Sequence, residues 1–147
     1  MQWDIQSAIP HRPPFLLIDK IIALDETEIV AESGAWTDSE LFSRVFTGHY
    51  PGNPITPGVL LCEMVFQAGA VLLSHRLHGK SQGTPVLVRI RDARFKKAVR
   101  PDEPLVIRAS FLEQVSNAFY MKGSVKHEDK TAVRVAFTCA LMPENTE

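Results

Sequence analysis

The sequence predicts an α+β fold in which an antiparallel sheet wraps around one long, buried, apolar helix. Three observations predict it: two strand-like segments come first, an almost wholly apolar helical stretch follows, and the rest of the chain reads as strands without another helix. Parallel strands need crossover connections that are usually helical, so this order favours an antiparallel sheet. The chain has 147 residues, 45% of them hydrophobic and 22% charged, and we expect a single domain over residues 1–147.

Two strands and a short helix are predicted before the long helix. Residues 15–24 form an apolar-rich run, and residues 29–36 alternate with polar residues as a half-buried strand does. Residues 37–46 carry apolar side chains at helical spacing, with Thr37 or Ser39 as a candidate cap, which predicts a short helix.

The long helix is predicted from residue 58 to at least residue 73. Glu63 and Gln67 are its only polar side chains, and a helix that is hydrophobic all round is a buried one. We expect no membrane span, because spanning needs about 20 apolar residues and this run is shorter and carries a carboxylate. Gly69 in the interior predicts a close neighbour, and Gly79 is a candidate helix end.

Five strand-like segments follow the helix, separated by predicted turns. The segments are residues 86–91, 93–99, 105–113, 119–126 and 132–141, with turns at 100–102, near 116–117 and at 128–130. One layer of sheet leaves a side of the apolar helix uncovered, so we expect a second copy of the chain to cover it. The alternative is that the N-terminal segment and the short helix cover that side within one chain.

Charge and cysteine content narrow the classes of function. Lys plus Arg number 16 and Asp plus Glu 17, so the net charge of −1 does not indicate a nucleic acid or an anionic membrane as partner. The two cysteines and the absence of a signal-peptide pattern favour reduced thiols in the cytoplasm. The five histidines show no metal-ligand spacing, and His75 and His78 fit the end of a helix, where imidazoles favour the helix dipole.

Residues 46–67 contain three features that acid–base chemistry on a carbonyl compound requires. His49 lies in a loop rich in proline and glycine, which would aim an imidazole whose pKa is near neutrality. Glu63 falls in the second turn of a buried helix, where burial would raise its pKa and let it hold a proton. Gly58 opens the helix and lets a ligand approach backbone N–H groups at the positive end of the dipole.

Each of these residues also has a plainer interpretation. A loop histidine is usually a capping or packing residue, and a buried glutamate is usually paired with a partner such as arginine. Gln67 lies on the same helical stripe as Glu63, so we expect it to hydrogen-bond that carboxylate or a neighbouring loop.

Two longer segments carry a resemblance to a known family. Residues 9–21 (IPHRPPFLLIDKI) and residues 48–63 (GHYPGNPITPGVLLCE) closely resemble the FabZ-type β-hydroxyacyl-acyl carrier protein dehydratases, and residues 93–104 (ARFKKAVRPDEP) are similar to a later block of that family. The resemblance implies the hotdog fold and the elimination of water from a (3R)-3-hydroxyacyl thioester on acyl carrier protein, giving the trans-2-enoyl thioester. It implies no metal or organic cofactor.

The resemblance also implies roles for three residues. His49 would remove the proton at C2, Glu63 from the opposite subunit would assist departure of the C3 hydroxyl, and the backbone N–H of Gly58 would polarise the thioester carbonyl. It further implies a homodimer, in some members a trimer of dimers. A sibling group of dehydratase-isomerases pairs His with Asp, so Glu63 argues against isomerase activity.

The chain departs from the family pattern at a few positions. Tyr50 replaces a more usual Phe, Thr56 stands where Met is common, and Phe66 stands where the family often has Ala. We expect these residues to support the site or line its acyl tunnel, and a bulky Phe66 to shorten or redirect that tunnel. Asp102 replaces a usual turn glycine.

A basic segment follows the helix in the sequence. Residues 89–100 hold six basic residues and one acidic residue, a local charge of +5. Acyl carrier proteins are acidic, so we expect a docking patch made from some of five residues. These are Arg91, Arg94, Lys96, Lys97 and Arg100. The alternative is a solvated strand face; nucleic acid fits less well, because Phe95 is the only aromatic residue in the segment.

Three functions remain open from the sequence. The dehydratase leads because it uses both His49 and Glu63. A hotdog thioesterase would hydrolyse a similar thioester without needing this pair, and a non-catalytic hotdog domain would bind acyl thioesters without turning them over.

Overall fold

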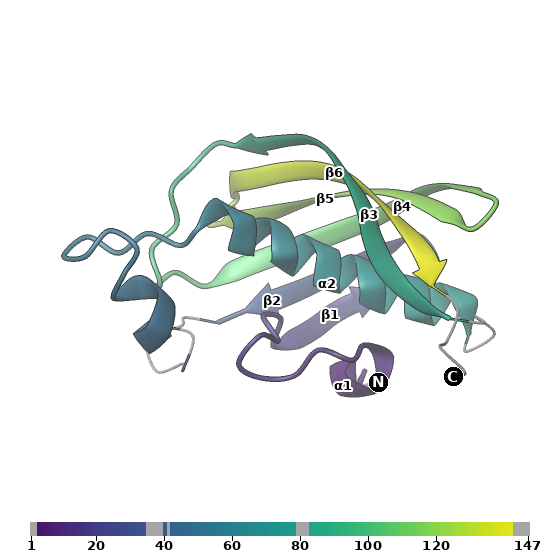
Figure 1. The fold of residues 1–147 in the computed structure, drawn as a ribbon, viewed down its shortest axis with the longest axis horizontal. Helices are drawn as coiled ribbons and strands as arrows, with labels where there is room; N and C mark the ends of the chain where they lie inside the picture. The colour runs from purple at the N-terminus through teal and green to yellow at the C-terminus, as the bar shows by residue number, and fades with distance from the viewer. Residues whose placement is uncertain (1–2, 35–39, 41, 79–82, 143–147) are drawn as a thin grey trace.

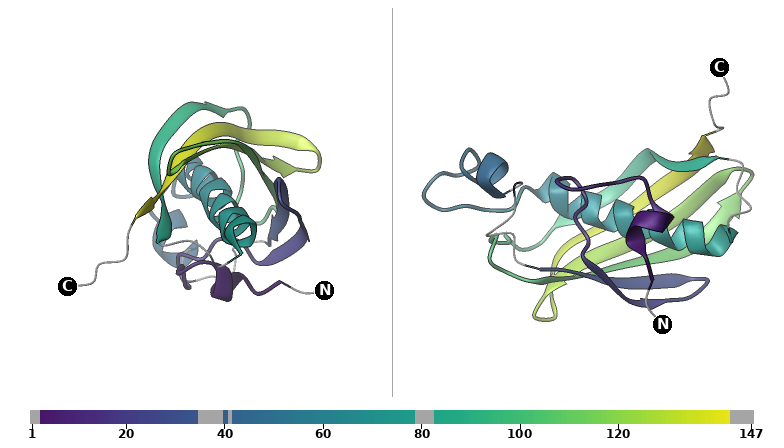
Figure 2. Two further views of the ribbon diagram at one scale, coloured as in Figure 1. Left: turned by 90° about the vertical axis from the view of Figure 1, so that its right-hand side faces the viewer. Right: turned by 90° about the horizontal axis from the view of Figure 1, so that it is seen from below.

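A six-stranded antiparallel sheet wraps around the helix α2 (Gly58–Leu77) in a computed structural model that describes residues 3–34, 40, 42–78 and 83–142 (Figures 1 and 2). The strand order across the sheet is β1-β2-β4-β5-β6-β3, and each neighbouring pair is antiparallel. The strands are β1 (Lys20–Leu24), β2 (Glu28–Ser33), β3 (Thr84–Phe95), β4 (Leu105–Val115), β5 (Ala118–His127) and β6 (Lys130–Met142). The predicted arrangement of sheet and helix is therefore confirmed.

The N-terminal segment differs from its prediction. It begins with a short helix, α1 (Ile5–Ala8), and β1 starts only at Lys20, so the strand expected from residue 15 is wrong in its first half. The backbone N–H of Leu17 and the carbonyl of Phe15 bond to the side chain of Gln67 instead of to a strand. These residues form a strap across the helix rather than part of the sheet.

The predicted short helix is only partly described. Residues 35–39 and 41, which include both candidate caps and the end of the strand predicted to reach residue 36, lie outside the described residues. Residues Phe42–Phe46 form a π-helical turn, η1, in place of the expected α-helix. The N–H groups of Gly48 and His49 then donate to the carbonyl of Val45, which leads the chain into the loop before α2.

Helix α2 continues four residues past the apolar run that ends at residue 73, within the predicted range. It has 20 residues, so by length and composition it could cross a membrane, and the argument that the run is too short is wrong. Of its most apolar 18-residue stretch, 61% is buried inside the protein, as is usual for a core helix. A Cβ at Gly69 would lie 2.8 Å from the Phe137 ring, so the predicted close neighbour is confirmed. His78 ends the helix with φ 49°, and Gly79 lies outside the described residues.

After α2, three predicted strands and three predicted turns are confirmed. One stretch that was predicted to form two strands forms a single strand. Strands β4, β5 and β6 and the turns at 101–102, 116–117 and 128–129 lie where they were predicted. Residues 86–91 and 93–99 are not two strands: β3 runs continuously from Thr84 to Phe95, with an irregularity between Arg91 and Arg94. Asp92 has φ 50° there, a local kink that breaks the apolar pattern without ending the strand.

The core lies between the concave face of the sheet and α2. Fully buried side chains include Phe119, Phe137 and Met121 from the sheet and Met64 and Leu72 from the helix. The N-terminal segment covers another side of α2 with its own buried residues, Ile5, Ile9, Leu17 and Ile18. The N-terminal segment therefore covers part of the helix within one chain, which was the alternative to cover by a second copy.

Candidate active site

The loop before α2 holds His49 by backbone contacts. Nδ1 of His49 lies 2.7 Å from the carbonyl oxygen of Ile55. A carbonyl can only accept, so we assign the proton of the neutral ring to Nδ1, which leaves Nε2 unprotonated. Tyr50 packs edge-on against the imidazole at 4.7 Å between ring centroids, with φ 57°. The loop therefore fixes the orientation of the imidazole and leaves Nε2 without a hydrogen-bond partner among the described residues.

A pocket of about 630 Å³ lies between this loop, the beginning of α2 and the end of β3. It is lined by six of the residues singled out in the sequence: His49, Tyr50, Thr56 and Gly58, and two of the basic residues, Lys96 and Lys97. A Cβ at Gly58 would lie 2.6 Å from the Phe95 ring, so a larger residue there would require that ring to move. The first N–H groups of a helix have no intrahelical acceptor, and those of α2 are the natural donors to a polarised carbonyl in this pocket.

Glu63 faces a different set of residues, in the N-terminal segment. Its Oε2 accepts a hydrogen bond from Nε2 of Gln67 at 3.0 Å and lies 3.6 Å from Nε2 of His11. Burial raises the pKa of Glu63, although the Gln67 bond and the nearby imidazole oppose this. Glu63 is not among the described residues that line the His49 pocket of the same chain. One protomer therefore presents the expected base and acid in different places.

Gln67 is completely buried and connects Glu63 to the N-terminal segment. Its Oε1 accepts from the N–H of Leu17 at 2.8 Å, and its Nε2 donates to the carbonyl of Phe15 at 2.8 Å as well as to Glu63. It thus makes both of the contacts considered from the sequence, to the carboxylate and to a neighbouring loop.

Two other residues lie outside the His49 pocket. The Phe66 ring packs edge-on against Phe137, at 5.0 Å between centroids. Cys62 is buried, and burial raises the pKa of its thiol, so it is not activated as a nucleophile. Burial also raises the pKa of Cys139, to about 11.

The contact between His11 and Glu63 was not expected from the sequence. The two residues are 52 positions apart, so no local pattern connects them. Arg12 holds this part of the chain by donating to the carbonyls of Ile9, His11 and Gln6. In the sequence, the only indication was that His11 and Arg12 lie within residues 9–21, the segment that resembles the dehydratase family.

The five basic residues expected to form one patch are divided by the structure. The Arg91 guanidinium lies over the Tyr120 ring, and Lys97 pairs with Glu103 at 3.6 Å. Arg100 is exposed beyond the end of β3. The five residues therefore do not gather into one patch, and docking of a carrier on some of them stays a prediction.

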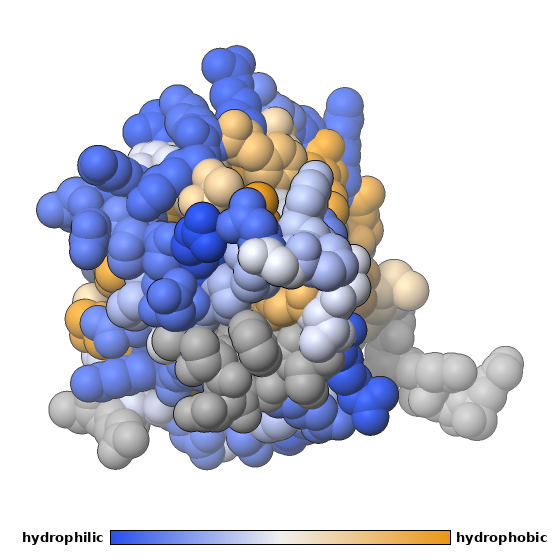
Figure 3. All heavy atoms as spheres, turned by 90° about the vertical axis from the view of Figure 1, so that its left-hand side faces the viewer, coloured by the Kyte–Doolittle hydropathy of each residue, from blue (hydrophilic) through white to orange (hydrophobic). Residues whose placement is uncertain are grey.

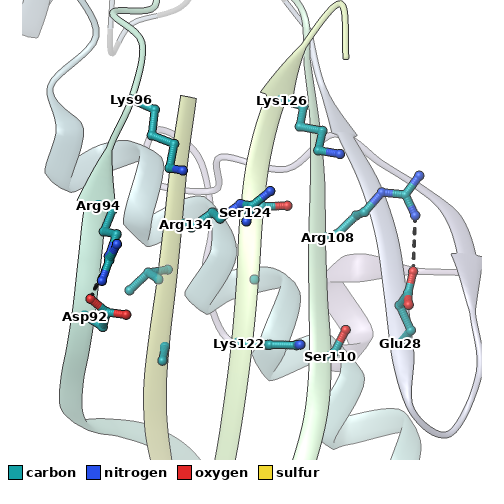
Figure 4. A pocket seen from close by; sticks show the side chains of 13 residues that line it. Glu28, Asp92, Arg94, Lys96, Arg108, Ser110, Lys122, Ser124, Lys126 and Arg134 are labelled. Carbon is teal, nitrogen blue, oxygen red and sulfur yellow. Dashed lines mark hydrogen bonds and ion pairs between the residues drawn. The ribbon is translucent and has the colours of Figure 1, made fainter. Parts of the chain in front are cut away.

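A basic basin instead spans five strands, β2, β4, β5, β6 and β3, on the convex face of the sheet, with a volume of about 520 Å³ (Figure 4). We use this name for the hollow lined by six cations: Arg94, Lys96, Arg108, Lys122, Lys126 and Arg134. Its carboxylates are Asp92, paired with Arg94 at 2.9 Å, and Glu28, paired with Arg108 at 3.2 Å. The other four cations make no ion pair within the described residues. Lys96 also lines the His49 pocket, so the two hollows meet at that residue.

Comparisons with known proteins agree with the sequence motifs. The FabA-like domain family matches residues 9–136. The chain is 35% identical over 140 residues to the 3-hydroxyacyl-[acyl-carrier-protein] dehydratase FabZ of Caulobacter vibrioides, covering 95% of this chain and 86% of that protein. It is 32% identical over 138 residues to the FabZ of Rickettsia bellii, covering 94% and 93%.

Solved structures resemble the whole fold. The dehydratase heterocomplex ApeI:P from Xenorhabdus doucetiae contains a chain with a TM-score of 0.82 at 18% identity, covering 100% of this chain and 95% of that one. A protein from Pyrococcus horikoshii gives a TM-score of 0.72 at 15% identity, covering 99% and 97%. At these identities the likeness concerns the fold, and it confirms the expected hotdog architecture.

Proposed function

The chain belongs to the FabZ-type 3-hydroxyacyl-[acyl-carrier-protein] dehydratases, within the FabA-like family, and we propose that His49 of one protomer and Glu63 of a second protomer carry out its reaction. The enzyme is a hydro-lyase of fatty acid biosynthesis. The observation that carries the assignment of His49 is its Nδ1 contact with the Ile55 carbonyl, which leaves Nε2 free to accept a proton.

Elimination needs a base at C2 and an acid at the C3 hydroxyl. Nε2 of His49 removes the C2 proton, and the N–H of Gly58 donates to the thioester oxygen as negative charge develops there. Protonated Glu63 donates its proton to the hydroxyl, which leaves as water while the C2–C3 double bond forms. A proton then passes from the His49 imidazolium to the Glu63 carboxylate, which restores both groups.

A second protomer supplies the acid because Glu63 is absent from the His49 pocket of its own chain, within the residues that the structure describes. The surface near that pocket also favours a dimer. β3 is the last strand of the sheet, with one edge unpaired, and large apolar side chains are exposed on it. The exposed fractions are 56% for Val88, 51% for Ile90 and 57% for Phe95, and 72% for Val59 on α2. Figure 3 views the end of the molecule where α2 begins and shows apolar surface beside strongly hydrophilic surface.

Antiparallel pairing of two β3 edges would continue the sheet across both subunits and cover these side chains. We propose a homodimer of this kind, with assembly into a trimer of dimers as a further step, and a cytoplasmic location in which both thiols stay reduced. Val88→Asp would place a charge in the middle of the interface. We expect this variant to elute as a monomer and to lose dehydration, whereas Val115→Asp, at an exposed site outside β3, should remain a dimer.

We further propose that the acidic carrier docks on the basic basin. Four unpaired cations attract an acidic surface, and the continuity at Lys96 would let the thioester arm pass from the basin to the His49 pocket. This replaces the single-segment patch expected from the sequence, and it keeps Arg94 and Lys96 while adding residues of β4, β5 and β6.

The reaction is tested by mass spectrometry of a 3-hydroxyacyl carrier incubated with the enzyme. A loss of one water with the thioester intact supports the dehydratase. Free acid with bare carrier would instead establish a thioesterase, and an unchanged carrier over several chain lengths would favour a binding protein.

Docking is tested with the double variant Lys122→Gln/Lys126→Gln. We expect its KM for carrier-bound substrate to rise about tenfold, with little change for a pantetheine-bound analogue. The control variant Lys20→Gln/Lys130→Gln removes the same charge elsewhere and should behave as wild type. Equal effects of the two double variants, or equal salt dependence for both substrates, would contradict docking at the basin.

A further inference from the structure

The N-terminal segment places an imidazole against the carboxyl group of Glu63. Nε2 of His11 lies 3.6 Å from Oε2 of Glu63, and that oxygen also accepts the hydrogen bond from Gln67. Both donors thus approach the same oxygen. Oε1 has no hydrogen-bond partner among the described residues, so it is the oxygen that remains available to a substrate.

The other ring nitrogen of His11 shows which tautomer is present. Nδ1 is buried and has no hydrogen-bond partner within the described part of the chain. A buried N–H without an acceptor is rarer and more costly than a buried acceptor without a donor. The proton of the neutral ring therefore belongs on Nε2, facing the carboxyl group. At 3.6 Å the contact is longer than a hydrogen bond, but catalytic contacts often shorten when substrate binds.

We propose that His11 is a positioning residue for Glu63: together with Gln67 it holds Oε2 as an acceptor, so that Oε1 carries the proton that is donated to the leaving hydroxyl. This rests on the proposed role of Glu63 as the acid. As Glu63 gives up its proton, negative charge develops on the carboxyl group, and the two N–H donors stabilise it. His11 thereby makes proton donation easier without touching the substrate.

Contacts with neighbouring residues hold the segment that carries His11 in position. The Arg12 guanidinium donates to the carbonyls of Ile9 and His11, and the His11 ring stacks near Phe15 at 6.4 Å between centroids. The carbonyl of Phe15 in turn accepts from Gln67. A residue kept for packing alone would not leave a buried nitrogen without a partner, because an apolar side chain avoids that cost.

Few polar or charged groups contact the carboxyl group of Glu63. From its own helix it meets neutral Gln67, and from the N-terminal segment it meets His11. The nearby Arg12 guanidinium is directed at backbone carbonyls. In the proposed dimer, His49 of the second protomer faces the same site. Removal of His11 should therefore change the titration of Glu63 in a direction that can be measured.

The test compares His11→Leu, which removes the donor, with His11→Gln, whose amide N–H can replace Nε2–H. Two quantities are measured: kcat and KM against pH, and the titration of the isotope-labelled Glu63 carboxyl group by NMR, identified by its absence in Glu63→Gln. His78→Gln is the matched control, since His78 also contacts a glutamate, Glu26, at 3.1 Å, but at the far end of α2.

We expect His11→Leu to lower kcat about tenfold with KM nearly unchanged, and to move the Glu63 titration to higher pH. His11→Gln should restore most of kcat, and His78→Gln should match wild type. Wild-type kcat and titration in His11→Leu would overturn the proposal. Equal loss in both His11 variants with an unmoved titration would also overturn it, since that indicates a purely structural role.

The two proposals fail in different ways. If wild type releases no water from the substrate, the proposed function is wrong. The NMR titration needs no turnover, and it still shows whether His11 acts on the Glu63 carboxyl group.

Discussion

His49 and Glu63 are held in the protein by different means. The His49 imidazole bonds to a carbonyl only six residues away, within its own loop. The surroundings of Glu63 come from Gln67 one turn further along the helix and from His11, 52 residues earlier in the chain. The proposed base is thus oriented by local structure, whereas the surroundings of the proposed acid depend on the docking of the N-terminal segment against α2. Substitutions of the two residues and of their contacts should distinguish the effect of local structure from that of long-range packing.

The largest effect is expected from His49→Ala. Loss of the base should reduce elimination by about 10³-fold or more, while the fold stays intact because a half-buried loop imidazole contributes little to the core. Mass spectrometry of the acyl carrier and thermal unfolding measure the two quantities. Normal release of water by this variant would exclude His49 as the base.

Glu63→Gln should lower turnover by about 10²-fold or more. The glutamine keeps the volume and an oxygen that can accept from Gln67, but it has no acidic proton to donate. Steady-state kinetics at saturating substrate measure the effect. Retained wild-type kcat would mean that another group acts as the acid.

Gln67→Leu should damage both stability and catalysis. It leaves the buried N–H of Leu17 and the partly buried carbonyl of Phe15 without their partner, which should cost about 2 kcal/mol in the free energy of unfolding. We expect kcat to fall by about tenfold, because the Glu63 contact is lost as well. Denaturant unfolding and kinetics test this, and unchanged stability would show that the strap across α2 is held by other contacts.

The pH dependence of stability follows from the raised pKa of Glu63, whose main cause is burial. The folded protein binds this proton more tightly than the unfolded chain, so the group destabilises the fold as pH rises above its ordinary pKa and through its folded pKa. Glu63→Gln should therefore be more stable than wild type at neutral pH and no more stable at about pH 3, where the carboxyl is protonated in both states. Melting temperatures of both proteins across this range give the comparison; a difference that grows toward low pH would have the wrong sign.

The smallest effect is expected from Cys62→Ala. The thiol adjoins Glu63 in sequence but is buried, with a raised pKa, so kcat should stay within about twofold of wild type. A large loss of activity with the fold retained would require a role for this thiol in the site.

The motifs around His49 and Glu63 predicted the fold and the family, and both predictions are confirmed. The roles of the two residues stay predictions. The predicted strand from residue 15 failed because Gln67 takes the backbone groups of Phe15 and Leu17, a contact across about fifty residues that no local pattern contains. The five basic residues of the predicted docking segment are divided in the structure, and the basin combines two of them with cations from other strands; docking itself stays a prediction.

Sequence alone determined the order of the elements, the apolar core helix and the types of residue available for acid–base chemistry, since periodicity and loop composition act over a few residues. Only the tertiary structure decided which residues meet. Packing of the N-terminal segment on α2 brings His11 to Glu63, and pairing of β4, β5, β6 and β3 brings the basic residues into one basin. Such contacts depend on three-dimensional packing between segments that are far apart in the chain, and local preferences do not encode them.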